Sequence, residues 1–195
     1  MQKVNGQMLK KKICRITFLL VAVILIARIV VVNFQWPAAD LIEIPPKESF
    51  YMQGLTMSVI SSFIATPSEV YEEYDIAEEE KEQLFLEQMI AQGWDAKVLV
   101  VALSAVNETN SKITFRAGSL MAECGPWSNG VDHDLFKVAN QSTGTIEIEP
   151  GQFKNIYLFY DLYDQHFTVT AWKSLDSLPF ALSISLYPEK ILLYV

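Results

Sequence analysis

A long apolar run near the N-terminus is the strongest pattern in the chain. Residues 16–34 are apolar except for Thr17, Arg28 and Asn33. As a helix rising about 1.5 Å per residue they would extend about 28 Å, close to the roughly 30 Å hydrocarbon thickness of a bilayer. The pattern therefore predicts one transmembrane helix over residues 16–34.

Beyond residue 52 the pattern changes to short runs rich in β-formers, separated by turn residues about every ten positions. This spacing is typical of an antiparallel β-sandwich. We predict a mainly β fold, an immunoglobulin-like sandwich with one or two short helices. The β-rich runs cover residues 53–65, 98–107, 112–123, 132–140, 144–149, 154–163, 166–172, 180–187 and 191–195.

One acidic segment departs from the β pattern. Thr66 precedes Pro67 and Glu69, which together form a helix-start signature with a capping box. A second stretch with helical spacing ends at Gly93, a natural helix stop. We therefore expect an acidic helical segment over residues 67–92, and we interpret its glutamates as a solvated face rather than a cation site.

These patterns divide the chain into four parts. Residues 1–15 form a basic segment and residues 16–34 the membrane span. Residues 35–52 contain three prolines and are predicted to form an extended stalk. Residues 53–195 then form one sandwich domain, because this length suffices for one hydrophobic core.

Charge on the two sides of the span predicts its orientation. Residues 1–15 carry five Lys or Arg residues and no acid, so the positive-inside rule places the N-terminus in the cytoplasm. A cleaved secretory signal is the competing interpretation. Arg28 and a β-branched run occupy the place where a cleavage site would need small residues, which favours an uncleaved signal anchor. The predicted location is the cell membrane, with the domain on the extracytoplasmic side.

The charge of the predicted outer part excludes one class of partner. Residues 1–34 hold six of the 15 basic residues and none of the 23 acidic ones, which leaves residues 35–195 with nine basic and 23 acidic residues, a net charge of −14. Nucleic acid is therefore not an expected partner, because phosphate binding needs a cationic face. Cys14 and Cys124 fall on opposite sides of the predicted membrane and cannot form a disulfide within one chain.

Three stretches of the chain together suggest a family. Residues 98–107 are a strand ending in an N-x-T turn, residues 147–161 have a Pro-Gly turn before a strand, and residues 183–195 form a terminal hairpin with Tyr187-Pro188 at the bend. The chain resembles an uncharacterised family of membrane-anchored bacterial surface proteins, chiefly Gram-positive, with one immunoglobulin-like sandwich. The resemblance implies no activity and no functional residues.

Cys124 is the first residue to consider as a nucleophile. Glu-Cys-Gly-Pro-Trp has half of a thioredoxin-type motif and lacks its second cysteine. Anchored sortase-like transpeptidases use histidine, cysteine and arginine in that order, whereas this chain has Arg116, Cys124 and His133. A buried or loop thiol is the simpler interpretation.

The remaining candidates are weak sites for a metal or a partner. Asp132 and Asp134 are metal candidates, because two carboxylates in a loop could hold calcium with carbonyls and water. Trp127 lies among Gly, Pro, Ser and Asn and is a candidate exposed aromatic for recognition, with packing over a sandwich end as the alternative. Arg28 either snorkels towards the headgroups or pairs with another membrane helix.

We therefore expect a non-catalytic, membrane-anchored extracytoplasmic domain that serves protein interaction or an accessory role, with an unidentified protein partner. A ligand- or metal-binding sensor module is the alternative, and an anchored cysteine transpeptidase-like enzyme is the third interpretation. No cofactor is predicted, and the membrane is expected to be contacted through residues 16–34.

Overall fold

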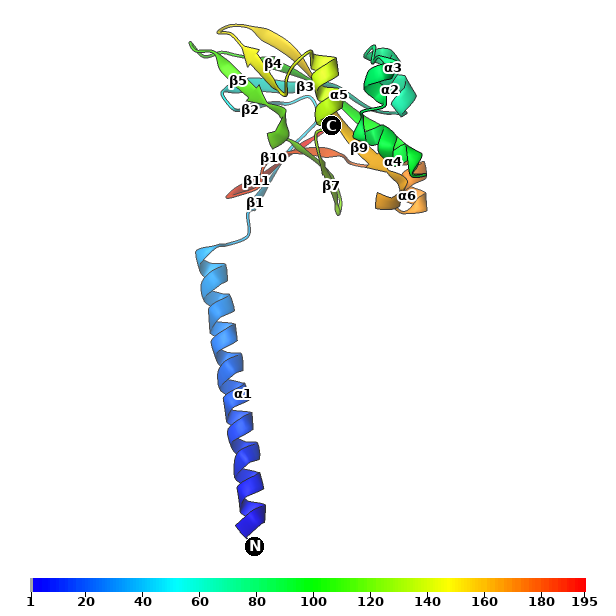
Figure 1. The fold of residues 1–195 in the computed structure, drawn as a ribbon. Helices are drawn as coiled ribbons and strands as arrows, with labels where there is room; N and C mark the ends of the chain where they lie inside the picture. Colours follow the sequence, from blue (N-terminus) through cyan, green and yellow to red (C-terminus); the bar gives the residue numbers. More distant parts are fainter. Residues whose placement is uncertain (1) are drawn as a thin grey trace. The chain divides into compact units, whose positions relative to one another are not determined.

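The computed structural model describes residues 2–195, with side chains from Arg15 onward, and its ribbon is shown in Figure 1. Most of the predicted basic segment 1–15 therefore lies outside the described side chains. The chain divides into two compact units, Met1–Asp40 and Leu41–Val195. Each unit is described by itself.

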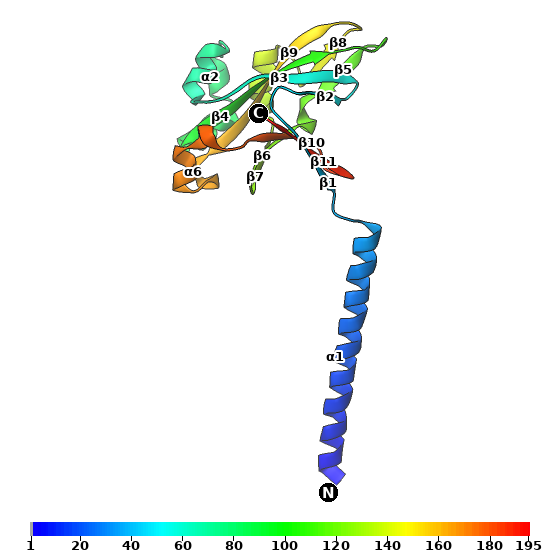
Figure 2. The same ribbon diagram turned by 180° about the vertical axis from the view of Figure 1, so that it is seen from behind.

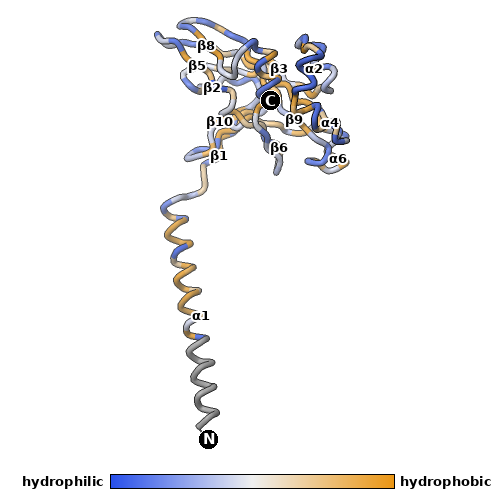
Figure 3. Tube along the Cα trace, in the orientation of Figure 1, coloured by the Kyte–Doolittle hydropathy of each residue, from blue (hydrophilic) through white to orange (hydrophobic). Residues whose placement is uncertain are grey.

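The first unit is a single helix, α1, which spans Gln2–Gln35. Within it, Arg15–Gln35 is a candidate membrane span of 21 residues with a mean hydropathy of 2.7. Figure 3 shows hydrophobic residues along most of the described part of this helix. The helix predicted over residues 16–34 is confirmed, and the candidate span has nearly the same limits.

The second unit is a β-sandwich with short helices, which confirms the predicted fold class. Its sheets have the strand orders β1-β11-β10-β6-β7, β2-β3-β4-β9 and β5-β8. The strands are β1 Asp40–Ile44, β2 Ser49–Met52, β3 Leu55–Ala65, β4 Ala96–Val106, β5 Ile113–Arg116, β6 Met121–Cys124, β7 Trp127–Gly130, β8 Thr145–Ile148, β9 Phe153–Tyr163, β10 Ala181–Ser185 and β11 Glu189–Tyr194.

Helical segments are more numerous than the one or two that the sequence predicts. The α-helices of this unit are α2 Pro67–Glu73, α3 Glu78–Lys81, α4 Phe85–Ala91, α5 His133–Asn140 and α6 Val169–Lys173. Three short 3₁₀ turns cover Ala117–Ser119, Asp164–His166 and Leu175–Ser177. In Figures 1 and 2, α2–α4 lie together on one side of the sandwich.

Strand β4 is buried on both of its faces. Leu99, Val101 and Leu103 point into the main core between the sheets. Val98 and Val100 point the other way, into a second core beneath the helices. A strand covered on both sides has no polar face, which explains the nearly continuous apolar sequence of residues 98–103.

The second core holds the helices against the outer face of β4 and β9. Val70 from α2, Leu86 from α4 and Leu135 from α5 pack there with Val100 and Phe159 of the sheet. The three helix residues are at most 1% exposed. Complete burial of such side chains contributes roughly 1.5–3 kcal/mol each, so apolar packing fixes these helices on the sheet.

The outer edge of β9 is closed by polar groups from β7 and α5. The Asn140 side chain donates to the Tyr157 carbonyl at 2.8 Å and accepts from the Tyr157 N–H at 2.9 Å. The Asp132 N–H donates to the Phe159 carbonyl at 2.8 Å. Because these bonds occupy the free backbone groups of the edge, they block strand addition there. They also fix the start of α5 over β9.

Two predictions about local structure differ from the structure. Residues 132–140 were expected to be a strand, yet Asp132 accepts from the Asp134 and Leu135 N–H groups and starts α5. Residues 166–172 were also expected to be a strand, yet the Thr168 hydroxyl caps α6 by accepting from the Ala171 N–H. In both cases a side-chain cap at the start of the segment outweighs its β-rich composition.

The predicted stalk over residues 35–52 is also wrong in its second half. Residues 40–52 contain β1 and β2, and β1 lies beside β11 in the five-stranded sheet. The Tyr194 hydroxyl donates to Glu43 at 2.7 Å and joins the two strands. Because this partner is about 150 residues away in sequence, no local pattern indicates it.

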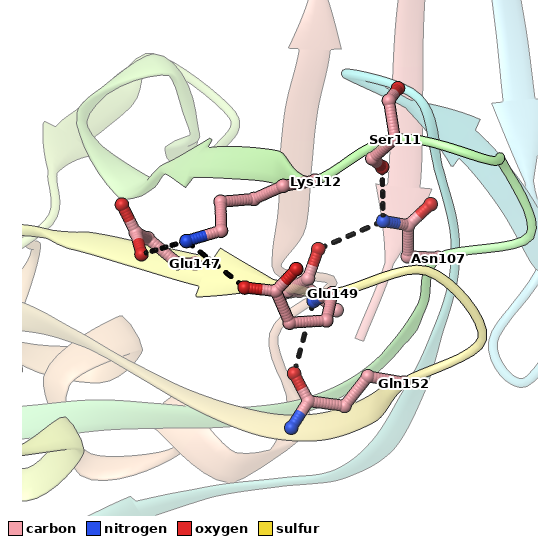
Figure 4. Close-up of polar contacts among 7 residues, drawn as sticks. Asn107, Ser111, Lys112, Glu147, Glu149 and Gln152 are labelled. Carbon is pink, nitrogen blue, oxygen red and sulfur yellow. Dashed lines mark hydrogen bonds and ion pairs between the residues drawn. The ribbon is translucent and has the colours of Figure 1, made fainter.

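Asn107 connects three segments at the end of β4 (Figure 4). Its amide donates to the carbonyls of Ser111 and Ile148, both at 2.8 Å. Its side-chain oxygen accepts from the Thr109 N–H and hydroxyl, at 3.0 and 2.7 Å. Asn107 is 0% exposed. The N-x-T turn is thus a buried hydrogen-bonded junction.

We predict that Asn107→Ala lowers the free energy of unfolding by about 2–4 kcal/mol, because it removes the side-chain donor to the buried Ile148 carbonyl and the acceptor of the Thr109 N–H and hydroxyl. Urea denaturation of residues 37–195 measures this change. The matched control is Asn110→Ala, an exposed asparagine of the same turn, which should stay within about 0.5 kcal/mol of the wild type. Equal effects of the two substitutions would contradict the assigned role.

Candidate functional site

A groove opens between α2 and the α3–α4 segment, at the end of the sandwich where β4 begins. Its volume is about 790 Å³. The wall and floor combine carboxylates with aromatic rings and a few small apolar residues. The carboxylates are Glu78, Glu82, Glu87 and Asp95, and the aromatic residues are Tyr71 and Trp94.

The capping box that the sequence predicts fixes the entrance of α2. The Thr66 N–H donates to the Glu69 carboxylate at 2.7 Å, while the Glu69 N–H donates to the Thr66 hydroxyl at 3.4 Å. The Thr66 hydroxyl also donates to the Glu69 carboxylate, at 2.8 Å. The bond from the Thr66 N–H, and then the bond from its hydroxyl, lower the pKa of Glu69. The groove begins at this cap, because Thr66 and Pro67 line it.

Two contacts hold the walls of the groove together. The Tyr71 hydroxyl of α2 donates to Glu87 of α4 at 2.8 Å. Burial, and then the bond to Glu87, raises the pKa of Tyr71. Trp94 packs edge-to-face on Tyr163 and His166, with ring centres 5.3 and 5.8 Å away. The two aromatic residues of the groove are therefore held in position before any ligand arrives.

A lysine of the chain itself already contacts this groove. The Lys81 ammonium lies 5.3 Å from the centre of the Tyr71 ring and forms an ion pair with Glu78. An ammonium group over an aromatic face and beside a carboxylate is a favourable arrangement for a cation. The groove thus has the geometry that a cationic side chain needs.

Negative charge is concentrated around the groove. Residues 66–96 contain ten carboxylates and one lysine, a net charge of −9. This segment therefore supplies nine of the 14 net negative charges of residues 35–195. A concave surface with charge of one sign raises the local concentration of oppositely charged ligands.

A second polar feature, the buried carboxyl group of Asp161 beside the partly buried one of Asp132, lies beneath the helices. Asp161 of β9 is 5% exposed and accepts from the Tyr163 hydroxyl at 2.9 Å. Its other oxygen has no hydrogen-bond partner among the described residues. Asp161 interacts with the carboxyl group of Asp132, which caps α5.

Burial and mutual repulsion favour the protonated form of Asp161. Burial, and then the charge of Asp132, raises the pKa of Asp161 to about 7. Burial also raises the pKa of Asp132, against the opposing effect of the Leu135 and Asp134 N–H groups that bond to it. Two carboxylates that are close together and poorly solvated repel each other, so the protonated form of one of them is favoured.

The structure separates the two predicted metal ligands. Asp132 is directed to Asp161, whereas the exposed Asp134 pairs with Lys137 at 3.2 Å. Among the side chains that the structure describes, no group of three or more His, Cys, Asp or Glu residues could hold a metal ion. Calcium binding by Asp132 and Asp134 stays a prediction.

Trp127 lies in β7 and is 8% exposed, so the expectation of an exposed loop residue is wrong. It packs on Phe167 and Phe180, with ring centres 5.7 Å away in both cases. The alternative, packing within the sandwich, is the arrangement observed. Cys124 lies opposite Trp127 in the β6–β7 ladder, and burial raises the pKa of its thiol. A raised pKa reduces the reactive thiolate, which disfavours a nucleophilic role.

Arg28 lies on α1 inside the candidate span, with an exposed side chain. Its partner, whether lipid headgroup or protein, stays a prediction. Asp161 was missed by sequence reasoning, although a signal was present. It stands between Phe159 and Tyr163 on one face of a strand, where a charged residue interrupts an apolar row.

The family model described as a domain of unknown function (DUF5028) matches residues 46–191. The chain belongs to the DUF5028 family. None of the curated proteins matches its sequence. The family description assigns no activity to these residues, and so it indicates no catalytic class for this DUF5028 domain.

Solved structures similar to this DUF5028 chain include an uncharacterised β-sandwich protein from Clostridium difficile. The two chains are 11% identical, with a TM-score of 0.42, and the alignment covers 81% of this chain and 95% of the other. The yjhA protein of Bacillus subtilis has 9% identity and a TM-score of 0.38, covering 75% and 84%. A functionally unknown protein from Listeria monocytogenes has 10% identity and a TM-score of 0.43, covering 70% and 68%.

The buried pair predicts a pH dependence of stability. The pKa of Asp161 in the folded chain, about 7, lies above its ordinary value of 3.8, so between about pH 4 and pH 7 the folded chain keeps a proton that the unfolded chain has released. The free energy of unfolding should therefore fall as the pH rises through this window.

Asp161→Asn should remove this contribution, because its amide oxygen can still accept from Tyr163 while its amide group donates to Asp132. We expect the variant to exceed the wild type in stability by roughly 2–4 kcal/mol at pH 8 and by much less at pH 4. Urea denaturation at both pH values measures the difference. Asp134→Asn, at the exposed neighbour, is the control. A stability difference between variant and wild type that does not change with pH would refute the raised pKa of Asp161.

Proposed function

We propose that this protein is a membrane-anchored, non-catalytic binding module whose acidic groove receives a cationic segment of a partner protein. The observation that carries the proposal is the combination, in one groove, of four carboxylates with the rings of Tyr71 and Trp94. Carboxylates neutralise a bound cation, and the rings contact both its charge and its aliphatic stem.

The dimensions of the groove support a side-chain ligand. A volume of about 790 Å³ lies within the range of sites that take small ligands or a few side chains. The contact of Lys81 with Tyr71 and Glu78 supports the choice of a lysine or arginine, since the chain itself places an ammonium group there. A partner cation would compete with Lys81 for this position.

The N-terminal helix supports location at a membrane. Its candidate span has the length and hydropathy of a membrane helix, and the basic residues before it indicate an N-terminus in the cytoplasm. In this proposal the span is an uncleaved anchor of the cell membrane, and the DUF5028 domain is extracytoplasmic. The partner is then a protein of the envelope or of another membrane complex.

The groove predicts a defined binding preference. A short peptide with lysine or arginine beside leucine should bind the full chain in nanodiscs, and a peptide with glutamate at the basic positions should not. Trp94→Leu should weaken binding about tenfold or more, and Glu82→Gln by roughly twofold to fivefold. Calorimetric titration at low and high salt measures the affinities.

The matched control is Glu72→Gln, because Glu72 is an exposed acid of α2 that does not line the groove. It changes the net charge as Glu82→Gln does. Equal losses in the two variants would mean that the acidic surface attracts the peptide without using the groove. Equal binding of free lysine and of the peptide would favour a small-ligand sensor over a protein-binding module.

The anchor makes a separate prediction. The full chain should stay in the membrane fraction after carbonate extraction, whereas a version without residues 1–36 should be soluble. A cleaved signal would give a soluble mature chain in both cases. Crosslinking in intact membranes, comparing the same two versions, then measures whether capture of a partner depends on the anchor.

A further inference from the structure

Part of one edge of β3 is not covered by another strand of the described chain. The sheet order places β3 between β2 and β4, but β2 pairs only with residues 55–58. Figure 2 shows β2 beside the end of β3 that is farther from α2. Among the backbone–backbone hydrogen bonds of the described residues, none joins residues 61–65 to a partner other than β4. We call residues 61–65 the open edge.

The chain turns away before it can cover this edge. Extended beyond Ser49, the line of β2 would run along the open edge. Instead, residues 45–48 form a turn in which the Glu48 N–H donates to the Pro45 carbonyl at 3.3 Å, and Lys47 has a φ of 72°. This turn ends the pairing at Ser49 and leaves the rest of β3 free on that side.

The open edge lacks the features that usually protect an exposed strand. Residues 61–65 contain no charged residue and no proline, whereas charge, proline or a covering segment commonly prevents strand addition. The β-bulge at Ile60 precedes the open edge and leaves its own pairing with β4 regular. Two other edges differ, since polar groups close that of β9 and β1 carries Asp40 and Glu43. The open edge is therefore suited to pairing with an added strand.

Side chains on both faces of the open edge are available to such a strand. Phe63 is 44% exposed. Ser62 and Ile64 line a pocket of about 260 Å³ together with Leu178 and Asp176. This pocket is smaller than most sites for whole ligands, roughly 300–1,000 Å³, and so suits a single apolar side chain. Backbone pairing beside a side-chain pocket is the arrangement by which sheets bind extended peptides.

The open edge leads directly into the acidic groove. Ala65 ends β3, and the next residues, 66–68, line the groove. A segment paired with the open edge would therefore reach the carboxylates of the groove within a few residues. Because the groove is acidic and the open edge is uncharged, charge complementarity favours a segment that is basic at the groove and uncharged along the strand.

We propose that a partner protein adds an extended strand to the open edge and places lysine or arginine residues adjoining that strand in the groove. The proposal rests on the function proposed above and specifies the conformation and sequence class of the partner segment. All neighbouring strands of this sheet are antiparallel, and an added strand that continues the line of β2 is antiparallel to β3 as well. Its first residues then lie beside Thr66, so the basic residues precede the strand.

Two peptides of the same composition test this order. The full chain in nanodiscs is titrated by calorimetry with Lys-Lys-Leu-Thr-Val-Thr-Val and with its reverse, Val-Thr-Val-Thr-Leu-Lys-Lys, both with blocked ends. The first peptide should bind about tenfold more tightly, because it alone brings its lysines to the groove while it pairs antiparallel with β3. Equal affinities, or tighter binding of the second peptide, would overturn the proposal.

Backbone methylation of the first peptide tests strand pairing without altering the protein. Methyl groups on both threonine nitrogens block one edge of the added strand, and methyl groups on the leucine nitrogen and the first valine nitrogen block the other. One pattern removes two hydrogen bonds to β3 and should weaken binding about tenfold, whereas the other faces solvent and should change it less than about twofold. Equal effects of the two patterns would contradict strand addition.

Further measurements locate the peptide and separate this proposal from the groove itself. A benzophenone side chain at the first valine should crosslink to residues 61–65, and crosslinks confined to β1 would overturn the proposal. If Trp94→Leu weakens binding while both methylated peptides bind alike, the groove stands and the strand addition fails. If neither change affects binding, both proposals fail. Disulfide-linked dimers of the Cys14→Ser, Phe63→Cys chain in vesicles would show a second copy at the open edge, which also overturns the proposal.

Discussion

Burial of β4 on both faces is the constraint on which the rest of this structure depends. One face closes the main sandwich core, and the other receives α2, α4 and α5. A strand at the surface of an ordinary sandwich has one solvated face, so the helices are needed here to cover an apolar sheet. Helices α2 and α4, together with α3, also form the groove. Residues 66–96 thus pack apolar side chains on the sheet, while their carboxylates line the groove.

The carboxyl pair lies at the junction of these helices with the sheet. Asp132 starts α5 and Asp161 belongs to β9, so the electrostatic interaction of the two carboxyl groups lies between the helical cover and the strand. A buried apolar contact would stabilise this position more simply, because burial disfavours charged carboxylates. Asp132 caps α5 through one of its carboxylate oxygens. Asp161 and Tyr163 provide a polar environment for the Asp132 carboxyl group. The pair makes the junction sensitive to pH in the range where Asp161 titrates.

The sequence predicts the local elements well where the cause is local. The 16–34 helix, the Thr66 capping box and the long strands at β3, β4 and β9 all follow from periodicity or caps within about a dozen residues. The failures have remote causes. Strand β1 depends on β11, and helix α5 depends on β9 and on a cap that was interpreted as a metal ligand. Of the groove, the sequence showed the acidic character, but its glutamates were interpreted as a solvated face. The inward position of Trp94 depends on its packing against Tyr163.

In this DUF5028 domain, a sheet covered on both faces positions the helices that form the acidic, aromatic groove proposed to bind a cationic segment. Chemical-shift mapping by NMR tests it most directly, with residues 37–195 titrated by a lysine-containing peptide. The account predicts that the largest shifts occur within residues 66–96, including the Trp94 indole N–H. Shifts centred on β1, β7 or the β10–β11 turn, with the Trp94 signal unchanged, would contradict it.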